Sequence, residues 1–182
     1  VAACLIVLLG SLLGTESPLT ITQMLWVNLI MDTFAAGALA SLPPNERVMK
    51  DKPRRSGKDG DFIITRPMAY NIFGVGFAFV VILMGLLFYF HAQDGLTPHD
   101  LSWFFSFFVM LQFWNMFNAK AFMEGRSAFA NLKDSKSFLL VALLILIGQY
   151  LIVTFGGEMF SVIPLSLRDW AIIIGSSSLV LW

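Results

Sequence analysis

Charged side chains are scarce in this chain of 182 residues. Asp, Glu, Lys and Arg together make up 13% of it, whereas apolar residues make up 57%. A typical soluble domain devotes about a quarter of its residues to charged groups. The composition therefore argues against an ordinary water-soluble domain and predicts a protein whose solvent is in large part lipid.

Neither sign of charge is in excess, because 12 Lys and Arg residues balance 12 Asp and Glu residues. The sequence therefore offers no basic surface for a nucleic-acid partner. Cysteine is almost absent, and the single Cys4 can form neither an internal disulfide nor a thiolate metal cluster. We expect Cys4 to be a small buried packing residue. His91 and His99 flank a segment without cysteines or clustered carboxylates, which favours a solvated or helix-end role over metal ligation.

Long apolar stretches are abundant, and a helix needs about 20 such residues to cross a bilayer. Four stretches are long enough, namely residues 20–42, 67–90, 101–121 and 137–155. Two shorter apolar runs, residues 1–13 and 169–182, are each too short to cross a bilayer. We expect them to be parts of longer helices, so that the given chain begins and ends inside a helix. Only helices and closed barrels satisfy their backbones in lipid, and these stretches are too long for strands. The predicted fold is all-α, a single polytopic transmembrane helix bundle over residues 1–182.

The basic residues predict the orientation of this bundle. Seven lie between the first and second long stretches (Arg47, Lys50, Lys52, Arg54, Arg55, Lys58 and Arg66). Four more lie from the end of the third stretch to the start of the fourth (Lys120, Arg126, Lys133 and Lys136), which leaves only Arg168 elsewhere. Two crossings separate these segments, so they share one side of the membrane, and the positive-inside rule makes that side cytoplasmic. Residues 14–19, 91–100 and 156–168 are then expected outside.

The cytoplasmic loop at residues 43–66 begins with Pro43-Pro44, which ends the preceding helix. Orientation and solvation alone are enough to explain its basic charge. A docking surface for a cytoplasmic partner is the alternative interpretation.

Asp32 differs from the other acidic residues because it lies near the middle of the stretch 20–42, whereas the rest lie in loops or at helix ends. An ionisable group there costs about 2.5 to 3.5 kcal/mol on insertion scales and marks a candidate functional site. Asn28 precedes it by four residues, so a helix places both side chains on one face. Calcium takes about six to eight oxygen ligands, and this pair supplies part of such a shell. The alternative is that Asp32 is protonated or hydrogen-bonded to another helix as a structural residue.

Several runs of sequence, one of which contains this pair, carry a resemblance to a known family. They are Gln23-Met24-Leu25-Trp26-Val27-Asn28-Leu29-Ile30-Met31-Asp32-Thr33, then Met49-Lys50-Asp51-Lys52-Pro53-Arg54, and then Gln112-Phe113-Trp114-Asn115 with Asn118-Ala119-Lys120. The chain thereby resembles the P-type calcium ATPases, most closely the plasma-membrane type. The first run matches the sixth membrane helix of that family, and the last two match the eighth. The similarity covers essentially the whole chain.

The resemblance implies the C-terminal transmembrane part of an ATP-driven calcium pump, with family helices five and ten in part and six to nine complete. In that family, Asn28 and Asp32 match calcium ligands of the sixth helix, which is unwound at the site. Ala3, Met31 and Gln112 stand where the two-ion pumps of the reticulum have further ligands, which implies one calcium site here.

The implied partners are the lipid bilayer, calcium and the remaining domains of the same pump, in the plasma membrane. ATP, magnesium and the phosphorylated aspartate would belong to those domains, so we expect no catalytic residue in this chain. The loop at residues 43–66 resembles the segment that contacts the phosphorylation domain. The rival hypothesis is a passive cation channel subunit or a membrane scaffold in which Asp32 is a structural polar residue. The expected truncation within helices argues against that rival.

Overall fold

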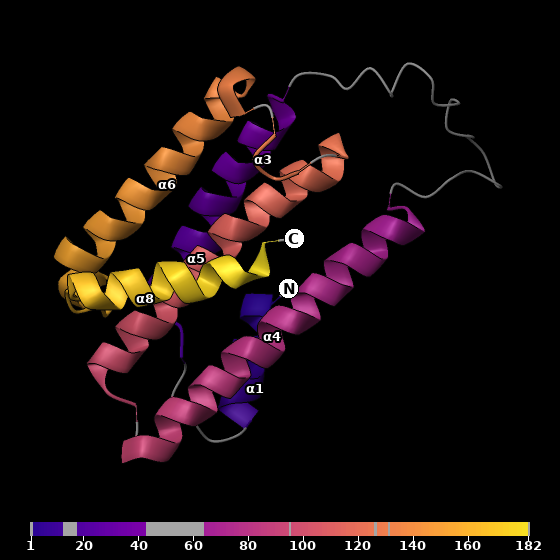
Figure 1. Cartoon of the computed structure of the whole chain (residues 1–182). Coiled ribbons are helices and arrows are strands. Elements are labelled where there is room, and N and C mark those ends of the chain that lie inside the picture. Colours follow the sequence, from indigo (N-terminus) through magenta and orange to yellow (C-terminus); the bar gives the residue numbers. More distant parts are fainter. Residues whose placement is uncertain are drawn as a thin grey trace.

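The computed structural model describes residues 2–12, 18–42, 64–94, 96–125, 127–130 and 132–181. Within these ranges every regular element is a helix (Figure 1). The predicted all-α fold is therefore confirmed. Most of the predicted cytoplasmic loop, up to residue 63, lies outside the described residues.

The helices follow one another with short connections in the second half of the chain. In order, they are α1 (Ala2–Leu12), α2 (Ile21–Leu25), the π-helical η1 (Trp26–Met31), α3 (Asp32–Ala40), α4 (Arg66–Asp94), α5 (Pro98–Glu124), the 3-10 turn η3 (Leu132–Asp134), α6 (Lys136–Phe155), α7 (Gly157–Phe160), α8 (Leu167–Ser177) and the 3-10 turn η4 (Ser178–Val180).

Two helices are long and apolar enough, by length and composition, to cross a membrane: Arg66–Ala92, with 27 residues, and Lys136–Phe155, with 20. They correspond to two of the four predicted spans. α5 also has 27 residues, but Gln112, Asn115 and Asn118 reduce its apolar character. No single α-helix covers the remaining span, because η1 lies between α2 and α3.

The helices that flank the two basic segments end on the same side of the molecule. The C-terminal ends of α3 and α5 and the N-terminal ends of α4 and α6 all lie toward the top of Figure 1. This arrangement agrees with the prediction that both segments lie on one side of the membrane.

α5 forms the centre of the bundle and contacts α4, α6 and α8. Its buried face is largely aromatic and includes Phe104, Phe105, Phe108, Phe113 and Phe117. Two serines on this helix are fully buried, and each donates its hydroxyl to the backbone carbonyl four residues earlier. Both hydroxyl hydrogens are thus bonded within α5, and the Ser102 hydroxyl oxygen also accepts the backbone N–H of Ile163 at 2.9 Å.

Three helices begin with the same arrangement, a capping box, at ends that the charge pattern places outside. The pairs are Thr20 with Gln23 in α2, Thr97 with Asp100 in α5, and Ser166 with Asp169 in α8. Each box satisfies backbone N–H groups that the first turn of a helix leaves unpaired. His99 lies 3.4 Å from the Asp169 carboxylate and so links the starts of α5 and α8, which agrees with the helix-end role predicted for it.

The prediction that Cys4 is buried is wrong, because its side chain is exposed. α1 packs against α4, and its buried positions are Ala2, Ala3, Ile6 and Gly10. Cys4 falls between these positions on the opposite face of the helix. Apolar sequence on all sides of a helix did not reveal which face the neighbouring helix covers.

Candidate functional site

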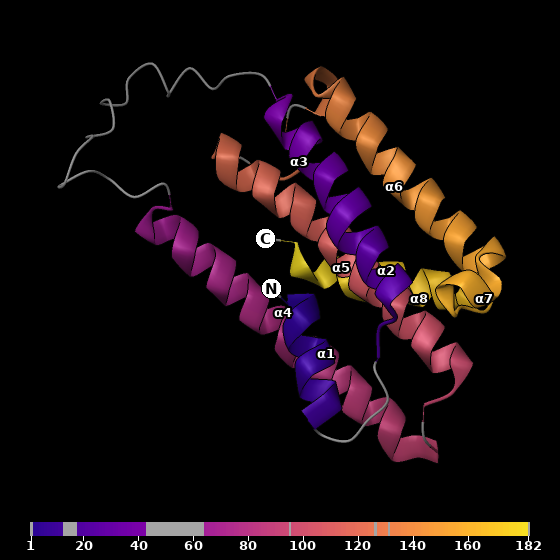
Figure 2. The same ribbon diagram turned by 180° about the vertical axis from the view of Figure 1, so that it is seen from behind.

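The candidate ion ligands lie on a helical rod formed by α2, η1 and α3 in succession (Figure 2). The junctions keep helical backbone angles, with φ −57° and ψ −50° at Trp26 and φ −66° and ψ −36° at Asp32. The turn between them is widened, because the Asp32 N–H donates to the Val27 carbonyl five residues earlier. The family resemblance implied an unwound helix at this position, whereas the structure has a π-helical turn inside a continuous helical rod.

Asn28 lies within η1 and Asp32 begins α3. Both side chains are exposed, whereas Val27 and Met31, each one position earlier, are 2% and 1% exposed. α3 contacts α5 and α6, and those helices leave the Asn28 and Asp32 side chains uncovered. Within the described residues the pair is therefore not enclosed, although it lies inside an apolar stretch of sequence.

This pair can offer a carboxylate and an amide carbonyl to a hard cation. No group of three or more His, Cys, Asp or Glu side chains gathers elsewhere in the described part of the chain. Ala3 is buried in α1, Met31 is buried beside the pair, and Gln112 is half-buried in α5. Two of these three side chains carry no oxygen, so among them only Gln112 has a side-chain oxygen to offer a cation.

Two glutamines connect the rod to neighbouring helices by hydrogen bonds. Neither was predicted from the sequence to have this role. Gln23 is 2% exposed, and its Nε2 atom donates to the carbonyl of Phe160 at 2.7 Å. Gln149 is 1% exposed, and its Oε1 atom accepts the indole N–H of Trp26 at 3.0 Å. A signal was available for Gln149, because an amide inside an apolar span requires a hydrogen-bond partner.

Gly148 lies beside this bond, at a point where α6 approaches the rod closely. A Cβ atom at this position would lie 2.8 Å from Cη2 of the Trp26 ring. Gly74, Gly76 and Gly85 in α4 differ, since a Cβ atom there would meet nothing within 4 Å in the described part of the chain. Of these four glycines, Gly148 alone therefore lies in a close contact within the described part of the chain.

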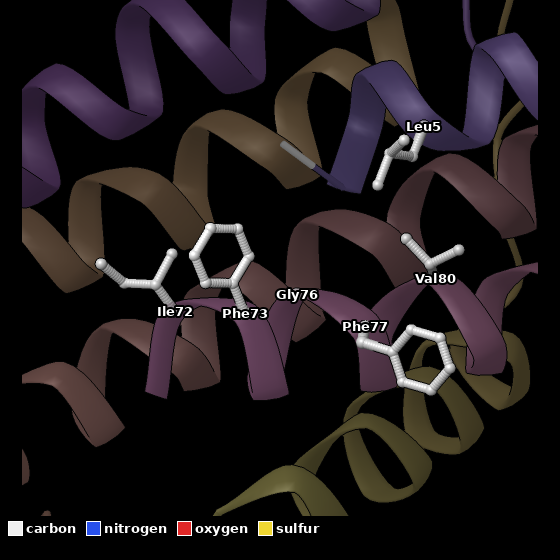
Figure 3. Close-up of a pocket in the computed structure, with 6 residues that line it drawn as sticks. All are labelled: Leu5, Ile72, Phe73, Gly76, Phe77 and Val80. Atoms are coloured by element: carbon white, nitrogen blue, oxygen red, sulfur yellow. The ribbon is translucent and has the colours of Figure 1, made fainter. Parts of the chain in front are cut away.

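An apolar groove lies between α1 and α4, well separated in sequence from the rod (Figure 3). It has a volume of about 260 Å³. Its lining residues are Leu5, Ile72, Phe73, Gly76, Phe77 and Val80. Because none of these side chains is polar, the groove has no means of binding an ion.

Comparison with known proteins gives the family of this chain. Residues 16–182 match the family described as cation transporting ATPase, C-terminus. The plasma membrane calcium-transporting ATPase 1 of Mus musculus is 34% identical over 195 residues, which cover 100% of this chain and 16% of that protein. The plasma membrane calcium-transporting ATPase 2 of Oreochromis mossambicus is 35% identical over 193 residues, covering 99% of this chain and 17% of that protein.

The human plasma membrane calcium-transporting ATPase 4 is 35% identical over 181 residues, covering 93% of this chain and 14% of that protein. The chain thus spans only about a sixth of the length of its curated relatives. The match nevertheless extends over nearly all of the chain, through the rod and the helices that hold it. This chain belongs to the cation-transporting ATPases and corresponds to their C-terminal region.

Proposed function

We propose that this chain is the C-terminal transmembrane part of an ATP-driven calcium pump of the plasma membrane, in which Asn28 and Asp32 bind the transported ion. The observation that carries the proposal is the placement of Asp32 at the end of a π-helical turn that also contains Asn28. π-helical turns inside α-helices occur frequently at functional sites. The relatives, which are calcium-transporting ATPases by name, support calcium as the ion.

In this proposal Asp32 supplies the negative charge and Asn28 a neutral oxygen. The exposed face that carries them is free to receive further ligands from helices outside this chain, which a calcium shell of about six to eight oxygens requires. A change from high to low calcium affinity then requires only that those helices move relative to the rod. The rod itself is held from behind by α5 and α6.

ATP, magnesium and the phosphorylated aspartate act, in this proposal, in domains outside the chain. The cytoplasmic loop at residues 43–66 would connect the ion-binding helix to those domains, as its resemblance to the family implies. A passive channel subunit or a membrane scaffold gains no support from the comparisons, since the matching proteins are ATPases by name.

Replacement of Asp32 by Asn in the full-length protein tests the proposal. The amide keeps the shape of the side chain and removes its charge, and neutral oxygens do not replace that Coulomb attraction to a divalent cation. We expect Asp32→Asn to abolish calcium-dependent phosphorylation by ATP. Glu158→Gln is the matched control, because it removes an exposed carboxylate from α7. Full calcium-dependent phosphorylation in Asp32→Asn would remove Asp32 from the mechanism.

A further inference from the structure

The indole of Trp26 is fixed against α6 by a hydrogen bond and by shape. Its N–H donates to Oε1 of Gln149 at 3.0 Å. Its ring occupies the space that a side chain at residue 148 would fill, since a Cβ atom on Gly148 would come within 2.8 Å of it. A bond and a close steric fit on consecutive residues of one helix leave the indole little freedom to rotate.

This contact lies where the helical rod changes its winding. Trp26 is the first residue of η1, and Asn28 follows two positions later. A π-helical turn is rare and is less regular than the α-helix around it, so it persists where neighbouring structure determines it. The Trp26 indole is the group that ties the start of this turn to another helix.

The rod is held again one turn earlier. Gln23 donates to the carbonyl of Phe160 at the end of α7, at 2.7 Å. α6 and the end of α7 therefore each make one hydrogen bond to the rod, and both bonds precede Asn28 in the sequence. These two bonds restrict rotation of the rod near the ion ligands, in addition to the packing of α3 on α5 and α6.

The chemistry of Gln149 argues that its bond has a role beyond filling space. Its side chain is 1% exposed, and its Nε2 atom has no hydrogen-bond partner among the described residues. Burial of an amide with one end unsatisfied is unfavourable, and a Leu or Met side chain would fill a similar volume without that cost. The compensating feature is the bond from Oε1 to the Trp26 indole.

We propose that Gln149 and Gly148 are positioning residues, which hold Trp26 so that the π-helical turn presents Asn28 and Asp32 to the ion in one fixed direction. The proposal rests on the proposed function for its effect on calcium. Without the contact, part of the free energy of calcium binding would be used to order the turn. Calcium affinity would fall, whereas the rest of the bundle would keep its packing.

The chain offers a matched control in a second bond of the same kind. The indole N–H of Trp114 in α5 donates to the hydroxyl of Ser177 in α8 at 3.1 Å. Trp26→Phe and Trp114→Phe each remove one indole N–H and keep an aromatic ring. Gln149→Met and Ser177→Ala remove the two acceptors. Trp26→Phe and Gln149→Met remove a hydrogen bond of the rod that carries Asn28 and Asp32. Trp114→Phe and Ser177→Ala remove a hydrogen bond between α5 and α8 instead.

The first measurement is the calcium concentration that gives half-maximal phosphorylation by ATP in the full-length protein. We expect Trp26→Phe and Gln149→Met to raise it roughly three- to tenfold, the range of interhelical hydrogen bonds in membranes, and the double variant to raise it no further. Trp114→Phe and Ser177→Ala should change it less than about twofold. Equal effects of the two tryptophan replacements, or additive effects in the double variant, would overturn the proposal.

The second measurement is amide hydrogen exchange of the peptide spanning residues 26–40 in purified full-length protein. We expect faster exchange in Trp26→Phe and Gln149→Met, and unchanged exchange in Trp114→Phe. This result does not depend on calcium. If Asp32→Asn retains calcium-dependent phosphorylation, the proposed function fails, and exchange alone decides the positioning role. Unchanged exchange in both Trp26→Phe and Gln149→Met would overturn that role.

Discussion

The Gln23 side chain donates a hydrogen bond of 2.7 Å to the backbone carbonyl of Phe160, across 137 positions of sequence. The same side chain accepts the Thr20 backbone N–H through Oε1 at 3.0 Å. The Gln23 amide thus caps the N-terminus of α2 and connects this helix to the end of α7. Both bonds are at the end of the rod that the charge pattern places outside.

Replacement of Gln23 by Leu is expected to destabilise the protein. The change keeps an apolar body of similar size but leaves the Phe160 carbonyl and the Thr20 N–H without their partner, at a cost of about 1 to 3 kcal/mol. We expect a lower thermal unfolding temperature of the full-length protein in detergent. Thr22→Ala is the control, because Thr22 precedes Gln23 and its side chain is not part of the capping box. Equal unfolding temperatures for the two variants would contradict the anchoring role.

Gly148→Ala should be destabilising, unlike the same change at Gly74. The added methyl group of the first variant would lie 2.8 Å from a rigid indole ring, and overpacking of this kind costs about 1 to 3 kcal/mol. At Gly74 the methyl group meets nothing within 4 Å in the described part of the chain, and Ala is favoured over Gly in a helix by about 0.5 to 1 kcal/mol. Thermal unfolding of both variants in detergent measures the difference. A Gly148→Ala protein as stable as Gly74→Ala would show that the rod can move away from α6.

Cysteine labelling at the two ends of α6 should give opposite sides of the membrane. Lys133 and Glu158 are both exposed, and each lies just beyond one end of this helix. The native Cys4 is exposed as well, so it must first be replaced by Ala. We expect an impermeant thiol reagent to label Lys133→Cys from the cytoplasmic side and Glu158→Cys from outside. Labelling of both from one side would refute α6 as a span.

The full-length protein should bind one calcium ion per phosphorylated molecule. The family resemblance implies that Ala3, Met31 and Gln112 stand where the two-ion pumps have further ligands, and the first two have no side-chain oxygen. We expect a measured ratio of one occluded calcium per phosphoenzyme, unchanged in Gln112→Ala. Asn28→Ala should weaken calcium binding while retaining some phosphorylation, because Asp32 keeps its charge. A ratio of two would exclude the single-site interpretation.

The class of fold and the choice of Asp32 could be predicted from the sequence because both depend on local composition. A run of about 20 apolar residues has no stable state in lipid other than a helix, whatever its neighbours are. A carboxylate within such a run is unusual in any arrangement of helices. The capping boxes at Thr20, Thr97 and Ser166 are equally local, since donor and acceptor lie three residues apart.

Which face of each helix is covered was decided only by the tertiary structure. Cys4 and Ala3 are neighbours in the same apolar run, yet Cys4 is exposed and Ala3 is 3% exposed. In a soluble helix, polar residues mark the outer face, but in an apolar span the lipid-facing side is as apolar as the buried side. The packing of α1 on α4 makes the distinction.

Lys120 shows the same limit for a charged residue. The sequence counts it among the basic residues of the cytoplasmic side, but the structure buries it completely and directs its Nζ atom to the Ala130 carbonyl at 2.6 Å. Similarly, the sequence shows Gln149 as an amide within an apolar run, and only the structure identifies Trp26 as its hydrogen-bond partner. The sequence alone predicted the helices, their orientation and one carboxylate within a span. Tertiary structure determined the partners of Lys120, Gln149 and Trp26, because residues distant in sequence meet only after the helices have packed.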